Sequence, residues 1–260
     1  MWTLLEGDSA EVLRALPADS IDLTVTSPPY DNLRTYNGFT FDFETIAQEL
    51  HRVTKPGGIV VWVVGDKTSK GSETGTSFKQ ALYFKSVGFK LHDTMIYLKK
   101  SCVYPDKNRY NNVFEYMFVL SKGKPKSYNL ISDKKNSTFG DKVSGSQRNV
   151  DGTLNYKRSK KGCPIKEFGV RDNVWLVDSG YMKTTKDKFA YDHPAMFPEQ
   201  LAQDHIITWS NEGDVVLDPF AGSGTTLKMA EILGRKSIGI EISSEYCEII
   251  KRRMAGGEGK

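Results

Sequence analysis

The chain has 260 residues, of which 38% are hydrophobic, so it can bury a sizeable core and is not disordered throughout. No apolar run approaches the roughly 20 residues that cross a bilayer, and residues 1–8 lack the pattern of a signal peptide, so we expect a cytoplasmic protein. The net charge is +4, but residues 121–190 hold 16 Lys and Arg against 7 Asp and Glu, and the rest holds 20 against 25. A basic block on an acidic body suggests a polyanionic partner, although a merely solvated insertion would give the same pattern.

The first half of the chain alternates predicted strands and helices. Residues 21–26 alternate apolar and polar side chains and predict a strand, which Ser27-Pro28-Pro29-Tyr30 must end because proline cannot continue a ladder. The continuous apolar run 59–64 predicts a strand covered on both faces, as in a parallel sheet. The remaining elements predicted here are helices over 42–54 and 78–87, a turn at 55–58, and strands over 89–98 and 112–120.

After residue 121 the periodicity fades, and Lys, Asn, Ser and Gly dominate up to about residue 190. We interpret this segment as an irregular insertion or a small basic domain. Order then returns with predicted helices over 198–210, 225–233 and 244–253, and predicted strands over 214–218 and 237–241. This alternation predicts an α/β fold with a mostly parallel sheet, which binds ligands at the carboxyl ends of its strands.

A glycine-rich turn follows the strand that ends at Asp218. Glycines at 222 and 224 let the backbone turn sharply and approach a ligand closely. The Gly-Lys-Ser/Thr ending of a phosphate-binding P-loop is missing, so a different nucleotide-like cofactor is indicated. Glu241 ends the next predicted strand, where a carboxylate can accept hydrogen bonds from ribose hydroxyls. Without Glu241, an ordinary turn would also explain the glycines.

The segment Ser27-Pro28-Pro29-Tyr30 has the chemistry of a pocket for a base extruded from nucleic acid. The two prolines fix the direction of the backbone carbonyls, Ser27 offers a hydroxyl and Tyr30 a flat aromatic face. An extruded base requires stacking and hydrogen bonds to its Watson–Crick edge. Taken alone, the segment would also fit a rigid end of a strand.

Together the two motifs resemble the DNA amino-methyltransferases of the permuted class, in which the acceptor motif precedes the cofactor motif. The resemblance rests on Thr26–Tyr30, Arg52–Gly58, His193–Pro198 and Val216–Thr226. It implies a Rossmann-like fold that binds S-adenosylmethionine, with a mostly parallel central sheet and a basic insertion. The catalytic domain would comprise residues 1–120 and 190–260, and residues 121–189 would form a basic target-recognition region.

The resemblance also implies roles for individual residues. Phe220 would pack on the adenine of S-adenosylmethionine, Glu241 would hold its ribose, and Asp218 would lie near its methionine amino group. Asp8 would help to bind the adenine end, although it could equally cap a helix over residues 9–16. His193 would line the methionine end or make a structural turn contact. The expected cofactor residues are Asp8, Phe197, Asp218, Pro219, Phe220, Ala221, Gly222, Gly224, Thr225, Thr226 and Glu241, and the expected catalytic residues are Ser27, Pro28, Pro29 and Tyr30.

The base and the partners follow from the same resemblance. The serine before Pro-Pro-Tyr resembles the residue found at this position in enzymes that methylate cytosine N4. Aspartate or asparagine is more typical of enzymes that methylate adenine N6, and adenine-N6 methylation is the main alternative. An RNA methyltransferase and a non-catalytic DNA-binding module are further alternatives. The expected partner is double-stranded DNA, and a homodimer and a cognate restriction nuclease are family-level expectations. Phosphate contacts are expected from Arg148, Lys157, Arg158, Lys160 and Lys161, with help from Tyr156. The three scattered cysteines suggest no metal site.

Overall fold

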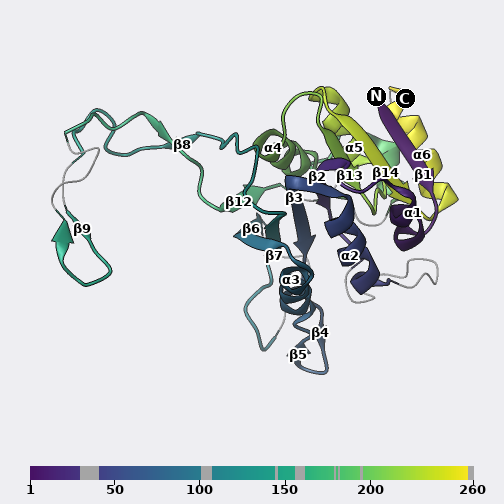
Figure 1. Ribbon diagram of the computed structural model, residues 1–260, viewed down its shortest axis with the longest axis horizontal. Helices are drawn as coiled ribbons and strands as arrows, with labels where there is room; N and C mark the ends of the chain where they lie inside the picture. Colours follow the sequence, from purple (N-terminus) through teal and green to yellow (C-terminus); the bar gives the residue numbers. More distant parts are fainter. Residues whose placement is uncertain are drawn as a thin grey trace. The chain divides into compact units, whose positions relative to one another are not determined.

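A computed structural model describes residues 1–29, 41–100, 107–143, 146–155, 162–178, 180, 182–193 and 196–256. The chain separates into two compact units (Figure 1). We call residues 1–129 and 173–260 the sheet unit, and residues 130–172 the small unit. In the described residues, no helix is long and apolar enough to cross a membrane.

The sheet unit is built on eight strands in the order β1-β14-β13-β2-β3-β7-β6-β12. β7 is antiparallel to both of its neighbours, and all the other neighbouring pairs are parallel. The carboxyl ends of the other strands therefore lie along one edge of the sheet, as the sequence predicted. The strands are β1 (Trp2–Glu6), β2 (Ile21–Thr26), β3 (Thr54–Val64), β6 (Lys90–Lys99), β7 (Phe114–Ser121), β12 (Val174–Val177), β13 (Val215–Asp218) and β14 (Lys236–Glu241).

Helices cover both faces of this sheet, because successive residues of the central strands point to opposite sides. In β3, Val61 and Val63 face a core formed with α4 and α5, whereas Val60, Trp62 and Val64 face a core formed with α1, α2 and α3. A third, smaller core joins Ile250 of α6 to α5. The helices are α1 (Ser9–Ala15), α2 (Phe43–Val53), α3 (Thr76–Val87), α4 (Glu199–Trp209), α5 (Thr225–Ile232), α6 (Ser244–Met254) and the short 3₁₀ helix η1 (Lys188–Asp192).

Most predicted elements are present within one or two residues, and the differences have physical reasons. We expected a turn over residues 55–58 before the strand. This prediction is wrong, because β3 already begins at Thr54 and includes these residues. The ladder is nevertheless interrupted there, since Ile21 pairs with Thr54 but Leu23 pairs with Ile59. β1 was not predicted from its short sequence. Its pairing with β14 supplies the hydrogen bonds that make it a strand.

The small unit contains short antiparallel pairs and no buried residue among those described in it. β8 (Lys134–Lys135) pairs with β11 (Phe168–Gly169), and β9 (Gln147–Arg148) pairs with β10 (Leu154–Asn155). The bidentate ion pair of Arg171 with Asp133 joins its two ends, with a shortest distance of 2.5 Å. This unit is narrower than the predicted region 121–189, because β12 and η1 belong to the sheet unit.

Candidate functional site

The two predicted loops lie at the same edge of the sheet. β13 pairs in parallel with β2, with Leu217 opposite Thr24, so both strands end side by side. The Ser-Pro-Pro loop (residues 27–29) follows β2, and the glycine loop (residues 219–224) follows β13. The topology thus brings together two segments that are almost 200 residues apart in the sequence.

A direct hydrogen bond joins the starts of the two loops. The Thr26 hydroxyl donates to Oδ1 of Asp218 over 2.7 Å, and both side chains are buried. The Thr226 hydroxyl donates to the carbonyl oxygen of Val25 over 3.2 Å, which ties α5 to the end of β2. The spacing between the loops is therefore fixed by the core of the sheet.

In the Ser-Pro-Pro loop, Pro28 is buried while Ser27 and Pro29 are half-buried. Buried proline between two partly exposed residues holds the backbone against the sheet and leaves the Ser27 side chain near the surface. Tyr30, predicted as the aromatic wall, lies outside the described residues.

The backbone conformation of the glycine loop requires glycine at two positions. Gly222 has φ +53° and Gly224 has φ +78°, values that side chains rarely adopt. A Cβ at Gly222 would lie 3.0 Å from Nε2 of His193, and one at Gly224 would lie 3.2 Å from Ile250. Gly224 also immediately precedes α5, so the loop leads into the amino end of a helix. The loop is bent and tightly enclosed, as the sequence predicted.

Two buried carboxylates flank this loop. Glu241 accepts hydrogen bonds from the backbone N–H groups of Gly222 (2.8 Å) and Ser243 (2.9 Å). Burial raises the pKa of Glu241 above its ordinary value. Each carboxylate oxygen has two lone pairs, so Glu241 can hold the loop and still accept hydrogen bonds from a ligand.

Asp218 is the more strongly shifted of the two. Burial raises its pKa to about 6, although hydrogen bonds from Thr26 and Thr226 and from the backbone N–H of Phe220 act in the opposite direction. Burial disfavours the ionised form of this carboxyl group, so a cationic group of a ligand beside it would be strongly favoured.

Phe220 lies at the edge of an aromatic cluster. Its ring centroid is 5.5 Å from that of Phe41 and 6.1 Å from that of Trp62, both in edge-on arrangements. The ring is half-buried, so it keeps a surface open to a partner. The position of the ring is compatible with the predicted adenine contact. The aromatic cluster alone also holds the ring in place.

Asp8 caps α1, as one of its two predicted roles requires. Its Oδ1 accepts hydrogen bonds from the backbone N–H groups of Ala10 (2.9 Å) and Glu11 (3.2 Å). The neighbouring Gly7 N–H donates to the carbonyl oxygen of Glu241, so the residue also lies beside the end of β14. The capping role is observed, and the cofactor role stays a prediction.

Of the residues expected at the methionine end, His193 lies against the glycine loop. The His193 ring is buried, with its centroid 4.4 Å from that of Tyr246, and it packs against Gly222. Phe197 is half-buried against the core shared by α4 and α5. His193 therefore acts at least as a structural support for the loop. Tyr246 was not singled out in the sequence.

The remaining predicted loop residues have structural contacts. The Pro219 carbonyl accepts a hydrogen bond from the Ser9 hydroxyl, and the Ala221 N–H donates to the carbonyl of Ile240. Thr225 accepts from the guanidinium of Arg253 over 2.9 Å. In the small unit, Arg148 lies on β9 and donates to its own hairpin at Gly152. Lys157, Arg158, Lys160, Lys161 and Tyr156 lie outside the described residues.

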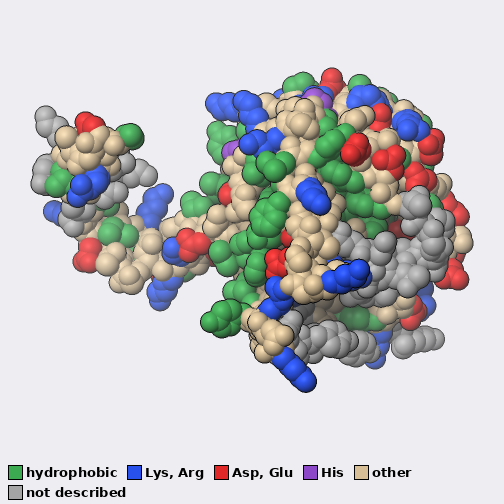
Figure 2. Space-filling model, turned by 90° about the horizontal axis from the view of Figure 1, so that it is seen from below, with side chains coloured by type: hydrophobic (Ala, Val, Ile, Leu, Met, Phe, Trp, Pro, Cys, Tyr) green, Lys and Arg blue, Asp and Glu red, His purple; other side chains and the backbone are tan. Residues whose placement is uncertain are grey.

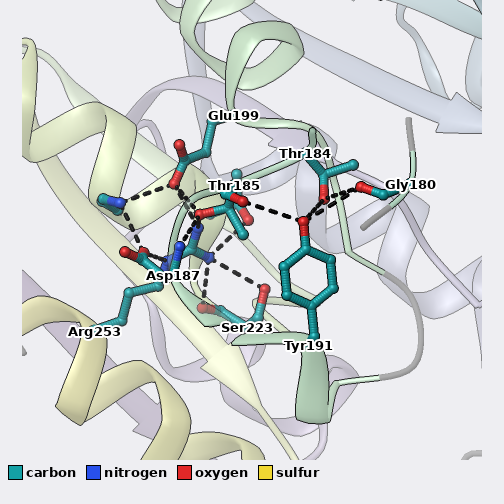
Figure 3. A network of polar contacts seen from close by, with 10 residues as sticks. Gly180, Thr184, Thr185, Asp187, Tyr191, Glu199, Ser223 and Arg253 are labelled. Carbon is teal, nitrogen blue, oxygen red and sulfur yellow. Dashed lines mark hydrogen bonds and ion pairs between the residues drawn. The ribbon is translucent and has the colours of Figure 1, made fainter. Parts of the chain in front are cut away.

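A buried polar network supports the glycine loop from behind (Figure 3). The Arg253 side chain, which is 0% exposed, donates to Asp187 (2.8 Å) and to Glu199 (2.7 Å). It also donates to the carbonyl oxygen of Ser223 over 3.0 Å. Lys228 bridges the same two carboxylates at 2.7 and 2.9 Å.

Two carboxylates and two cations thus balance one another behind the loop. Although burial would raise the pKa of Asp187 and Glu199, hydrogen bonds from Lys228, together with those from Arg253 to Asp187 and from Thr185 to Glu199, lower both values. The sequence offered no signal for these four charged residues, because they are far apart in the chain and none of them belongs to a motif.

The comparisons with known proteins point to one family. A family model described as DNA methylase, of the N6 and N4 type, matches residues 21–252. The chain is 62% identical over 237 residues to M.BamHII, an orphan methyltransferase of Bacillus amyloliquefaciens, covering 90% of this chain and 89% of the relative. It is 31% identical to YhdJ, a DNA adenine methyltransferase of Escherichia coli, covering 97% and 82%.

A solved structure extends the likeness to the cofactor. The DNA modification methylase TTHA0409 of Thermus thermophilus, complexed with S-adenosyl-L-methionine, matches with a TM-score of 0.65 and 26% identity, covering 99% of this chain and 94% of that one. The mostly parallel sheet and the cofactor expected from the sequence are thereby confirmed. The chain belongs to the N6/N4 DNA methylase family and is an S-adenosylmethionine-dependent DNA methyltransferase.

Proposed function

We propose that this enzyme methylates the exocyclic N4 amino group of cytosine at a specific DNA sequence, with the base extruded into the Ser-Pro-Pro loop. The observation that carries the proposal is the hydrogen bond from Thr26 to Asp218, which joins the base-holding loop to the cofactor loop. In a transfer without a covalent enzyme intermediate, positioning of the two reactants and electrostatic stabilisation supply the rate.

The residues around the glycine loop fit S-adenosylmethionine chemically. The cofactor supplies a methyl group on a positively charged sulfur, and it also carries an ammonium group and a ribose. Asp218 offers a buried negative charge for the ammonium group, and Glu241 offers free lone pairs for the ribose hydroxyls. Phe220 offers a half-buried ring for the adenine. Gly222 and Gly224 allow the backbone to approach closely.

On the acceptor side, Ser27 and the carbonyl oxygen of Pro28 would bind the amino group. The lone pair of such an amino group is delocalised into the ring, so the nitrogen is a poor nucleophile. Hydrogen bonds from its protons to these two oxygens would direct the lone pair toward the methyl group. Extruding the base costs a few kcal/mol, which contacts in the pocket must offset.

The choice of cytosine rests on Ser27. Serine is short and neutral, which distinguishes it from the aspartate or asparagine more typical of adenine enzymes. The relatives do not decide the matter, since YhdJ is named for adenine. Methylation of genomic DNA followed by mass spectrometry of nucleosides tests the proposal. N4-methylcytosine would support it, and N6-methyladenine would overturn it.

Replacing Ser27 with alanine should lower kcat about tenfold and leave the affinity for S-adenosylmethionine unchanged. The variant loses one hydrogen bond of about 1–1.5 kcal/mol to the reacting amino group. Single-turnover methylation and calorimetry measure the two effects. Ser20→Ala, which removes a half-buried hydroxyl bonded to the Pro17 carbonyl at the opposite end of β2, serves as the control. A Ser27→Ala variant that loses cofactor binding instead would contradict the proposed division of labour.

Replacing Gly222 with alanine should weaken cofactor binding at least tenfold and lower stability by about 1–2 kcal/mol through backbone strain. The new Cβ would lie 3.0 Å from His193 at a φ of +53°, so the loop must shift. Calorimetric titration with S-adenosylmethionine measures the change. Gly213→Ala, also at positive φ but with open space around it, controls for backbone strain. Equal binding by the two variants would show that the shape of the glycine loop is unimportant.

We further propose that the small unit contributes to target recognition. It holds 10 Lys and Arg against 5 Asp and Glu, and none of its described residues is buried. A basic segment that builds no core of its own suits binding to a polyanion. Arg148, Lys157, Arg158, Lys160 and Lys161 are the proposed phosphate contacts. If their joint neutralisation left DNA affinity and its salt dependence unchanged, this assignment would be wrong.

A further inference from the structure

A short polar hairpin lies at the same edge of the sheet as the Ser-Pro-Pro loop. β4 (Thr68–Ser69) and β5 (Ser72–Glu73) form it directly after β3. Thr26, at the end of β2, pairs with Trp62 of β3. Lys67 follows Trp62 by five residues, so it lies within about 17 Å of that position at about 3.4 Å per residue. The hairpin is therefore within reach of DNA bound at the loop.

The hairpin is held in place although it packs no apolar side chain. The Asp66 carboxylate accepts hydrogen bonds from the Ser77 N–H (2.9 Å) and the Ser77 hydroxyl (2.5 Å). The guanidinium of Arg109 donates to the carbonyl of Gly71, which ties the segment 107–110 to the tip. Two-residue strands without a hydrophobic face are not stable on their own, so these bonds fix their position.

The tip of the hairpin carries a lysine at a positive φ, where asparagine or glycine is usually found. Lys70 and Gly71 form the two-residue turn, with φ values of +48° and +80°. Such turns favour Asn or Gly at the first position, because a side chain there is strained. An exposed lysine in this conformation holds its charge at the outermost point of the hairpin.

The exposed side chains around the tip are mostly cations and hydroxyls, with one carboxylate from Glu73, and this balance suits a phosphate-binding surface. Lys70, Lys107 and Arg109 are exposed, and Lys67 is half-exposed. Hydroxyls of Thr68, Ser69 and Ser72 and the amide of Asn108 are exposed beside them. Phosphate oxygens accept hydrogen bonds from these side-chain types. Figure 2 views the molecule from below, the side on which Figure 1 draws β4 and β5.

We infer that this basic hairpin, residues 67–73 with Lys107 and Arg109, binds the DNA backbone beside the extruded base. It would act separately from the small unit and give register and affinity rather than sequence specificity. The inference rests on the proposed function, because it requires DNA to occupy the Ser-Pro-Pro loop. A protein partner is disfavoured, because the hairpin offers no apolar side chain to bury.

The test is the salt dependence of duplex binding by the Lys70→Gln/Lys107→Gln variant. Loss of two phosphate contacts should reduce the slope of log K against log salt by about 2 and weaken binding about tenfold or more at 0.1 M salt. Fluorescence anisotropy with a labelled duplex measures both. Affinity for S-adenosylmethionine and thermal stability should be unchanged, since both side chains are exposed.

Lys85→Gln/Lys90→Gln is the matched control. It removes the same charge from the last turn of α3 and the first residue of β6, at the opposite edge of the sheet. An unchanged slope in the hairpin variant, or equal changes in both double variants, would overturn the inference. The proposed function would still stand if the wild-type protein methylates DNA. A wild-type protein that failed to bind or methylate duplex DNA would overturn both.

Discussion

The Asp218→Asn variant will be more stable than the wild type at pH 7 and will bind S-adenosylmethionine at least tenfold more weakly. The stability gain arises because Asp218 is buried and its pKa is raised to about 6 from an ordinary value of 3.8. One pKa unit corresponds to about 1.36 kcal/mol, so its charge costs the fold up to about 3 kcal/mol. Asparagine can still accept the hydrogen bonds from Thr26 and Phe220.

The pH dependence of this gain has a definite sign. Below about pH 4, Asp218 is protonated in both the folded and the unfolded chain, so the variant gains nothing. Between about pH 4 and pH 6 the unfolded chain loses the proton first, and the wild type loses stability relative to the variant. Above pH 6 the difference is constant. Urea unfolding of the cofactor-free proteins from pH 4 to pH 8 measures it.

Cofactor binding should change in the opposite direction. A cationic group near Asp218 is attracted only to the ionised carboxylate, and a hydrogen bond to a charged group contributes about 1.5–3 kcal/mol. Wild-type affinity for S-adenosylmethionine should therefore fall as the pH drops through about 6, whereas the affinity of the variant should not. Glu245→Gln removes an exposed carboxylate from α6 and is the control. A destabilised Asp218→Asn variant with normal cofactor affinity would contradict this account.

The sequence predicted the site best where the chemistry is local. Gly222 and Gly224 sit in a short motif whose backbone demands are visible in the residue types, and the structure has the expected positive φ at both. The approach of Thr26 to Asp218 could also be predicted, because parallel strands place their carboxyl ends at one edge.

Other features depend on contacts that the sequence does not display. β1 and β12 are edge strands of the main sheet, and only their pairing with β14 and β6 makes them strands. The basic composition of residues 121–189 hid the fact that Val174–Val177 completes the main sheet. The hairpin β4–β5 lacks any apolar pattern, and the sequence predicted no element there. Long-range pairing decided each of these cases.

Replacing Arg253 with methionine should have the largest effect on stability, with a loss of about 3 kcal/mol or more. The substitution leaves Asp187 and Glu199 with Lys228 as their remaining cation among the described residues. Removing one partner from a buried ion-pair network costs about 3–5 kcal/mol, and the one-fifth exposure of both carboxylates favours the lower end.

Arg253→Lys separates the structural role from the positioning role. Lysine keeps the positive charge but cannot form the fork that reaches both carboxylates and the carbonyl of Ser223. Stability should therefore fall less than in the methionine variant, while cofactor affinity falls about tenfold because the glycine loop loses its support. Urea unfolding and calorimetric titration measure the two quantities.

Arg252 provides the matched control for both variants. It is the exposed neighbour of Arg253 on α6, and its guanidinium lies 4.2 Å from the ring centroid of Phe189. An exposed cation–π contact contributes about 0.5–1 kcal/mol, so Arg252→Met should lower stability by no more than that and leave cofactor affinity intact. Equal losses in the Arg252 and Arg253 methionine variants would show that the network behind the glycine loop adds nothing beyond ordinary surface charge. A loss confined to Arg253 would mean that the cofactor loop takes its shape from α6, through a residue outside both recognised motifs.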